Sequence, residues 1–295
     1  MISKIETKNS SIPSKELLSI FKNTKQEIKQ LADEAPDQLV ESVHLIRKRL
    51  KFLRAFVKLT QFCSNEHNYK PSNYILRDTG RTVSDCRDAH VRGMLLEEFS
   101  KNELTKNLVD ELAEINDSVT RKIETNLLSG RPVFDEINTN ISSVELNDYF
   151  ESLDPDANCL IDGLALGYKK SYHAFHSELK SHEADLLHEW RKRTKDLQYQ
   201  LEALLTSFPD QIPITYNDVC ELCEKLGRIN DLFMFLEWLD SIEESVEEKN
   251  QINNLKSALN RELKRLEEQA DAMGSSIFSL NPVDFSESLN DQLEL

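Results

Sequence analysis

Apolar residues recur at spacings of three and four along most of the chain, which is the period of an α-helix. The pattern predicts helices over five stretches, namely 14–35, 37–63, 72–128, 157–208 and 216 to about 270. The third stretch is too long for one globular helix, so we expect at least two helices there, with Gly80 and Gly93 as breaks. A further break is expected near 245–250.

Two stretches lack the helical period. Residues 130–155 are rich in Asn, Ser and Asp, and they predict an irregular connection between two halves of the chain. From 271 to 295 polar and acidic residues predominate around Pro282, which predicts a poorly ordered tail. The expected organisation is an N-terminal helical half at 1–145, a C-terminal helical half at 146–270 and the tail at 271–295.

Glycine and proline are scarce in this chain. There are 7 glycines and 8 prolines among 295 residues, which is about 5% against an average near 12%. Sheets need such residues at their turns, and a proline inside a helix would break it. The scarcity therefore predicts an all-α protein with prolines at the joints between helices.

Composition narrows the class of protein further. The first residues contain no apolar core of the kind that a secretion signal requires, and no apolar run approaches the roughly 20 residues that cross a bilayer. The five cysteines are odd in number and lie mostly among helical apolar positions, so we expect reduced thiols and no disulfide. These features predict a cytoplasmic protein that does not enter a membrane.

The net charge of the chain is −16. On average, the field of such a protein repels nucleic acid and anionic lipid. Any site for an anion must therefore be a local concentration of cations from which acidic residues are missing.

A basic pattern that begins with histidine occurs twice in the chain. HLIRKRLKFL begins at His44 and HEWRKRTKDL begins at His188, so the pattern HxxRKRxKxL recurs 144 residues apart with six identities in ten positions. Four of the six shared residues are basic, although the chain as a whole is acidic. The repetition indicates an internal duplication.

In the first copy the cations share one side of the expected helix. At 100° per residue, an arc of about 80° contains His44, Arg47, Lys51, Arg54 and Lys58. Residues 42–65 hold six Lys or Arg and no acid. An ordinary solvated helix surface interleaves the two signs, and like charges at this spacing repel one another. The stripe therefore predicts a site for a polyanion.

The two copies resemble the CHAD family, the conserved histidine α-helical domain, and the resemblance extends from about His44 to Trp238. In that family each half contains a helix that begins with histidine and continues with spaced arginines and lysines. Three further segments look like helices of the family, namely 76–88 with Arg77, Arg81, Arg87 and Asp88, 168–170 with Tyr168, Lys169 and Lys170, and 226–231 with Gly227 and Asp231.

The resemblance implies an all-α fold of two antiparallel four-helix bundles, related by a pseudo-twofold axis, with the basic helices facing a shared central cleft. The implied ligand is inorganic polyphosphate, with association to polyphosphate granules and with no catalytic residue, cofactor or metal. The residues that the resemblance places around this ligand are His44, Arg47, Lys48, Lys51, Arg54, Arg77, Arg81, Arg87, Lys169, His188, Arg191, Lys192 and Lys195.

Both copies depart from the family pattern, the second more than the first. Gln198 stands where a basic residue is usual, and Phe52 and Asp196 stand where a second adjacent basic residue is common. The resemblance therefore implies a weaker contribution from the second half.

Other readings of the same residues remain open. An enzyme could use His44 or His188 as a phosphoryl acceptor or general acid/base on phosphate esters, and release of phosphate would reveal it. Nucleic acid is disfavoured, because the stripe lacks base-stacking aromatics and the net charge has the wrong sign. Cys220 and Cys223 form a lone CxxC, which we interpret as core cysteines and not as zinc ligands.

Overall fold

The computed structural model describes residues 14–63, 69–100, 106–129, 132–152, 157–181, 183–205, 212–246 and 249–293. Apart from short 3-10 turns, every regular element within these ranges is an α-helix, and no strand occurs among them. The all-α prediction is confirmed. None of the helices in the described ranges is long and apolar enough to cross a membrane.

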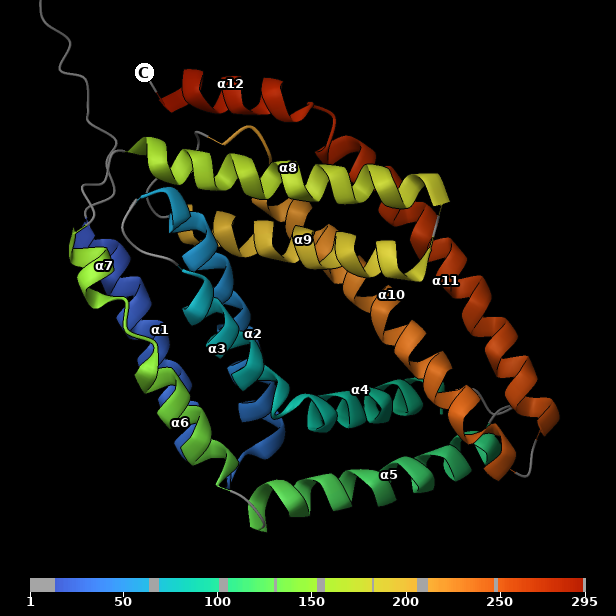
Figure 1. The fold of residues 1–295 in the computed structure, drawn as a ribbon. Helices are drawn as coiled ribbons and strands as arrows, with labels where there is room; N and C mark the ends of the chain where they lie inside the picture. Colours follow the sequence, from blue (N-terminus) through green and yellow to red (C-terminus); the bar gives the residue numbers. More distant parts are fainter. Residues whose placement is uncertain are drawn as a thin grey trace, which may run out of the picture.

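The first seven helices form one group, from which the paired helices α4 and α5 project to one side (Figure 1). They are α1 (Ser14–Glu34), α2 (Leu39–Leu59), α3 (Lys70–Arg81), α4 (Ser84–Phe99), α5 (Lys106–Ser129), α6 (Val133–Ser143) and α7 (Asn147–Ser152), with the 3-10 turn η1 (Thr60–Phe62) after α2. Helix α1 packs against α2, α6 and α7, while α3 packs against α2 and α6. Helices α4 and α5 pack against each other, and α4 extends to α10.

The remaining helices form a second group around α8 and α9. They are α8 (Ala157–Ser181), α9 (Ala184–Leu204), α10 (Tyr216–Ile242), α11 (Lys249–Ile277) and α12 (Pro282–Leu293), with the 3-10 turn η3 (Glu243–Ser245) at the expected break after α10. Helix α9 packs between α8 and α10, α11 covers α10, and α12 lies on α8. In both groups a histidine-bearing helix packs against the helix that precedes it, but the internal duplication itself stays a prediction.

The two groups meet where α2 reaches α8 and α9. At this junction the backbones approach closely, because a Cβ atom added at Gly163 of α8 would lie only 1.9 Å from the carbonyl oxygen of Leu59. Glycine is required there since any larger residue would push the end of α2 away. The helices that carry the two basic patterns, α2 and α9, are also in direct contact.

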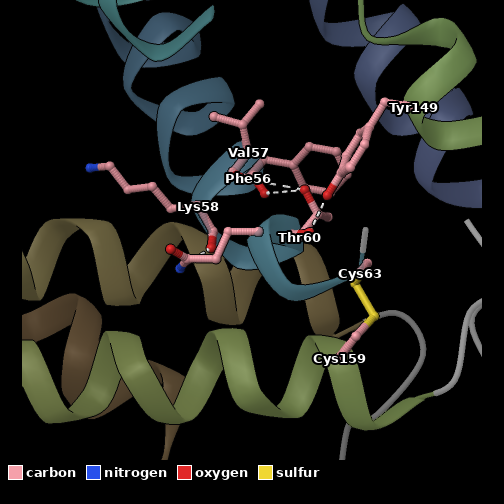
Figure 2. The surroundings of a disulfide bond; sticks show 8 residues. Phe56, Val57, Lys58, Thr60, Cys63, Tyr149 and Cys159 are labelled. Atoms are coloured by element: carbon pink, nitrogen blue, oxygen red, sulfur yellow. Dashed lines mark hydrogen bonds between the residues drawn. A yellow bond between two sulfur atoms is a disulfide. The ribbon is translucent and has the colours of Figure 1, made fainter. Parts of the chain in front are cut away.

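A disulfide joins the same two groups (Figure 2). Cys63, immediately after η1, is bonded to Cys159 in the first turn of α8, across a sequence separation of 96 residues. Next to it, the hydroxyl of Tyr149 donates to the carbonyl oxygen of Thr60. The expectation of no disulfide is wrong, because it rested on an odd cysteine count that does not exclude one pair among five. Cys86, Cys220 and Cys223 are free thiols.

Two expected irregular regions are helical instead. Within 130–155 the structure contains α6 and α7, whose residues Phe134, Ile137, Ile141 and Phe150 are buried. Gly93, an expected break, lies inside α4, whereas Gly80 lies one residue before the end of α3. Helices α6 and α7 are too short to show a clear helical period, and their few apolar residues pack against α1 and α3.

The expectation of a poorly ordered tail from 271 is also wrong. Helix α11 continues to Ile277, and α12 packs on α8 through Phe285, whose ring stacks on that of Tyr168 at 3.7 Å between centroids. Asn281 caps α12, since its side-chain oxygen accepts hydrogen bonds from the backbone N–H groups of Val283 (2.9 Å) and Asp284 (3.1 Å). Pro282 occupies the first position of the helix, where its missing N–H has no cost.

Candidate anion-binding cleft

A cleft of about 690 Å³ lies between α2, α3, α8 and α9. Its lining includes eleven Lys and Arg side chains, namely Arg47, Lys51, Arg54, Lys58, Arg77, Arg81, Lys170, Arg191, Lys192, Arg193 and Lys195, together with His188. Asp196 is the one carboxylate among the described residues that line it. In a chain with a net charge of −16, this is a strong local excess of cations.

Helix α2 supplies four of the cations because of its local periodicity. Arg47, Lys51, Arg54 and Lys58 follow one another at three- and four-residue intervals and therefore share one side of the helix. The neighbouring side carries Val43, Ile46, Leu50, Leu53 and Val57, all of which are buried. Burial of the apolar side thus turns the cations towards the cleft.

The arginines of α2 are held by α3 and the start of α4. One guanidinium nitrogen of Arg47 donates to the carbonyl oxygen of Gly80 (2.8 Å) and to the hydroxyl of Ser84 (2.9 Å). The Nε of Arg54 donates to the side-chain oxygen of Asn73 at 3.2 Å. Each guanidinium keeps further donors for a ligand, because arginine has five N–H groups.

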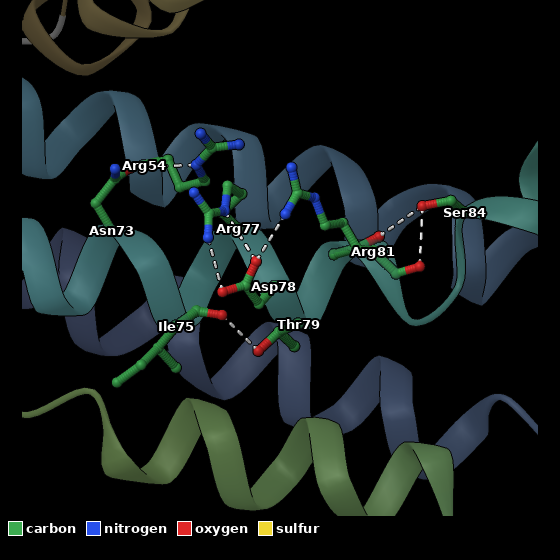
Figure 3. A network of polar contacts seen from close by, with 9 residues as sticks. Arg54, Asn73, Ile75, Arg77, Asp78, Thr79, Arg81 and Ser84 are labelled. Carbon is green, nitrogen blue, oxygen red and sulfur yellow. Dashed lines mark hydrogen bonds and ion pairs between the residues drawn. The ribbon is translucent and has the colours of Figure 1, made fainter.

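Helix α3 adds Arg77 and Arg81 next to Arg54 (Figure 3). Asp78 accepts two hydrogen bonds from Arg77, at 2.8 and 2.9 Å, and one from Arg81 at 3.1 Å. These contacts are exposed, so they orient the two side chains but stabilise the fold little. Asp78 does not line the cleft itself, and a multivalent anion could displace it from both arginines.

Lys51 is the most strongly perturbed cation of the cleft. Burial, followed by the nearby charges of Arg191, Arg47 and Lys195, lowers the pKa of Lys51 to about 7. The carboxylate of Asp231 on α10 opposes this shift. Burial in turn raises the pKa of Asp231, although Arg191 lowers it. The base of the cleft therefore lacks enough negative charge to keep Lys51 fully protonated at neutral pH.

One part of the cleft lies where α2 meets α8 and α9. Here Nζ of Lys58 donates to the carboxylate of Asp196 at 2.6 Å, and both side chains are largely shielded from solvent. Burial lowers the pKa of Lys58, while Asp196 raises it. Burial also lowers the pKa of Lys170, with further contributions from Arg193 and Lys58. Asp196 thus neutralises part of a cluster that would otherwise be wholly cationic.

The structure brings nine of the thirteen candidate residues to this cleft. They are Arg47, Lys51, Arg54, Arg77, Arg81, His188, Arg191, Lys192 and Lys195. The other four, His44, Lys48, Arg87 and Lys169, are not among its lining residues. His44 lies largely exposed near the start of α2, where the partial burial of its ring and the charge of Arg87 lower its pKa. Lys169 is exposed on α8, and the adjacent Lys170 faces the cleft instead.

Three lining cations were not among the candidates: Lys58, Lys170 and Arg193. Lys58 belongs to the periodic stripe that predicts a polyanion site, although the family resemblance does not place it around the ligand. Lys170 and Arg193 lie beside other basic residues, and the sequence does not show which of these side chains reach the cleft, because packing sets the rotation of each helix.

No group of three or more His, Cys, Asp or Glu side chains within the described ranges is arranged to hold a metal ion. Cys223 is buried among apolar residues of α10, and burial raises the pKa of its thiol to about 12. Burial also raises the pKa of Cys86 to about 11. Thiols with such pKa values remain protonated near neutral pH.

Comparison with known proteins identifies the family. A model of the CHAD domain matches residues 24–240. The crystal structure of the CHAD domain from the plant Ricinus communis is similar, with a TM-score of 0.67, 17% sequence identity and coverage of 95% of this chain and 96% of that chain. That likeness concerns the fold alone, and a search of curated proteins finds no match. Since the family model spans well over half of the sequence, the chain belongs to the CHAD domain family.

Proposed function

We propose that this protein binds inorganic polyphosphate, or a closely similar polyanion, in the cleft between α2, α3, α8 and α9, and that it does not catalyse any reaction of the ligand. The observation that carries the proposal is the imbalance of charge in the cleft, with eleven Lys and Arg facing a single described carboxylate. Membership of the CHAD family supports it, because the family resemblance implies this ligand.

In the free protein the Lys and Arg side chains of the cleft repel one another, and a bound anion would reduce this repulsion. The lowered pKa values of Lys51 and Lys170 both have nearby cations among their causes. Arginine and lysine bind phosphate oxygens through charge-assisted hydrogen bonds, which are about twice as strong as neutral ones. A ligand with many negative charges can neutralise several helices at once, and this favours a polymer over a single phosphate.

The dimensions of the site suit a chain of phosphates. Along α2, the distance from Arg47 to Lys58 is about 16 Å at a rise of 1.5 Å per residue. Several consecutive phosphates can be held over that length. Binding of successive phosphates by one rigid surface raises the effective concentration for each next contact.

Titration with polyphosphates of graded length tests the proposal. We expect affinity to rise with chain length until the cleft is filled, and to fall as salt is added. Single-stranded DNA of matched charge serves as the control ligand and is expected to bind more weakly. Phosphate release during incubation is expected to stay at background, and steady release would favour the hydrolytic alternative that uses His188.

A matched pair of variants connects binding to the cleft. Arg54→Gln removes a lining cation, whereas Arg265→Gln removes an exposed arginine of α11 that does not line the cleft. Hydrogen bonds to charged groups contribute about 1.5–3 kcal/mol, so Arg54→Gln should weaken binding about tenfold or more. Equal affinities for the two variants would refute the assignment of the ligand to this cleft.

Association with polyphosphate granules and a cytoplasmic location follow as parts of the same proposal. Disulfides such as Cys63–Cys159 are more typical of oxidising compartments, so the location needs a direct test. Fractionation of cells, with staining for polyphosphate in each fraction, would provide it. Recovery of the protein apart from polyphosphate would contradict the granule association.

A further inference from the structure

A second, smaller cavity adjoins the basic cleft. It has a volume of about 160 Å³ and lies between the first turns of α9 and the middle of α10. His188 and Arg191 line both cavities, so these two side chains form a shared wall. A molecule that occupies both cavities would therefore contact both of these side chains.

The chemistry of the smaller cavity differs from that of the cleft. Its apolar surface includes the buried Leu187 and Leu226, the partly buried Phe233 and the exposed Met234. Asp185 and Glu237, both exposed, supply carboxylates at its edge. Apart from the shared Arg191, none of the described residues around it is Lys or Arg.

This combination selects against several simple ligands. Additional phosphates would be repelled by Asp185 and Glu237 and would gain nothing from Phe233 and Met234. A pure hydrocarbon would leave the hydrogen-bonding capacity of the two carboxylates unused. A group with apolar ring faces and N–H or O–H donors at its edge satisfies both kinds of surface.

We propose that the smaller cavity holds the base of a nucleoside polyphosphate, with the ribose at the edge of the cavity and the phosphates passing His188 and Arg191 into the basic cleft. The ring faces of the base lie against Phe233 and Met234, and its amino groups or the ribose hydroxyls donate to Asp185 or Glu237. This inference rests on the proposed function, because the cleft must accept the phosphates. It adds a preference for a nucleoside at one end of the polyanion.

The order of residues along α9 agrees with this arrangement. Asp185 lines the smaller cavity alone, His188 and Arg191 line both cavities, and Lys195 lines the cleft alone. From Asp185 to Lys195 the helix rises about 15 Å at 1.5 Å per residue. The nucleoside and the phosphates would thus follow one helix in sequence, from its acidic start to its basic middle.

A comparison of two triphosphates tests the proposal. Adenosine triphosphate and methyl triphosphate carry the same phosphates with one esterified end, so they differ only in the nucleoside. Calorimetry without divalent cations should show adenosine triphosphate binding about tenfold more tightly, which corresponds to about 1.4 kcal/mol. Equal binding of the two triphosphates, or tighter binding of methyl triphosphate, would overturn the proposal.

Variants place the effect in the smaller cavity. Met234→Ala and Phe233→Ala should reduce the affinity for adenosine triphosphate to that for methyl triphosphate, and should leave the affinity for methyl triphosphate unchanged. Met94→Ala, at an exposed methionine of α4 that lines neither cavity, is the control. Met234 is 45% exposed, so its variant should fold even if the Phe233 variant does not. An advantage for adenosine triphosphate that survives in Met234→Ala and Phe233→Ala would overturn the assignment.

Polyphosphate in the same experiment separates the two proposals. If polyphosphate binds and adenosine triphosphate has no advantage over methyl triphosphate, the nucleoside site is refuted and the proposed function stands. If neither polyphosphate nor either triphosphate binds, the proposed function fails and the nucleoside site fails with it.

Discussion

The protonation of Lys51 should couple anion binding to pH. In the free protein its pKa is lowered to about 7, from an ordinary value of 10.5, by burial and by Arg191, Arg47 and Lys195. A bound phosphate would favour the charged ammonium and raise this pKa. Binding above pH 7 should therefore be accompanied by the uptake of a proton.

The size of this pH effect on affinity follows from the free energy of protonating Lys51. At pH 8 about one tenth of Lys51 is charged, so charging it for the ligand costs about 1.4 kcal/mol, which is one pKa unit. Affinity for polyphosphate should fall up to about tenfold per pH unit as pH rises above 7, and should be insensitive to Lys51 well below 7. Long chains are the right ligand, because their internal phosphates carry a constant charge over this range.

Lys51→Arg is the decisive variant. Arginine stays charged at all of these pH values, so the variant should lose both the decline in affinity above pH 7 and the proton uptake. Lys192→Arg, which changes another lysine that lines the cleft, should retain both. The assay is calorimetry at pH 7, 8 and 9 in buffers with different ionisation enthalpies. A parent protein whose affinity is constant from pH 7 to 9, or a Lys51→Arg variant that retains the decline, would refute the reasoning.

Four further changes have defined outcomes. Lys51→Met should weaken polyphosphate binding yet raise the free energy of unfolding at pH 7. Between about pH 7 and 10.5 the unfolded parent protein holds the Lys51 proton more tightly than the folded protein does, so the free energy of unfolding of the parent should increase with pH. Urea titrations across this pH range should show that the variant lacks this increase. Reducing the Cys63–Cys159 disulfide opens a loop of 96 residues and should lower the free energy of unfolding by up to about 4 kcal/mol. Equal urea midpoints with and without reductant would contradict this. Asp196→Asn removes a carboxylate and frees Lys58, so polyphosphate affinity should increase several-fold in calorimetry, and a decrease would exclude Asp196 as a competitor. Phe285→Ala should lower the free energy of unfolding by about 3 kcal/mol, compared with little change for the exposed Val283→Ala in the same urea titration.

The sequence of the C-terminal segment contains features that indicate the helix α12. Asn281 followed by Pro282 is a typical beginning of a helix, and Phe285 and Leu289 are spaced by four residues. The polar and acidic residues around them instead favour the prediction of a poorly ordered tail. Composition was misleading there because α12 buries only a narrow apolar side against α8, and Tyr168 provides the facing surface.

The disulfide illustrates a different kind of failure. Cys63 and Cys159 lie in different groups of helices, and their proximity depends on how α2 meets α8. No local pattern encodes a contact across 96 residues. The close approach at Gly163 helps to bring the two segments together, yet a glycine inside a helical pattern does not reveal which helix it faces.

The sequence by itself determined the longer helices and the two basic patterns, because the helical period and the clustering of charge are properties of neighbouring residues. It also supported the family. Only the tertiary structure decided that α2, α3, α8 and α9 border one cleft, that Lys170 and not Lys169 faces it, and that Asp196 and Asp231 lie near its cations. The reason is that packing sets the rotation of each helix, and adjacent residues point 100° apart, so the face that meets a partner depends on residues far away in the chain.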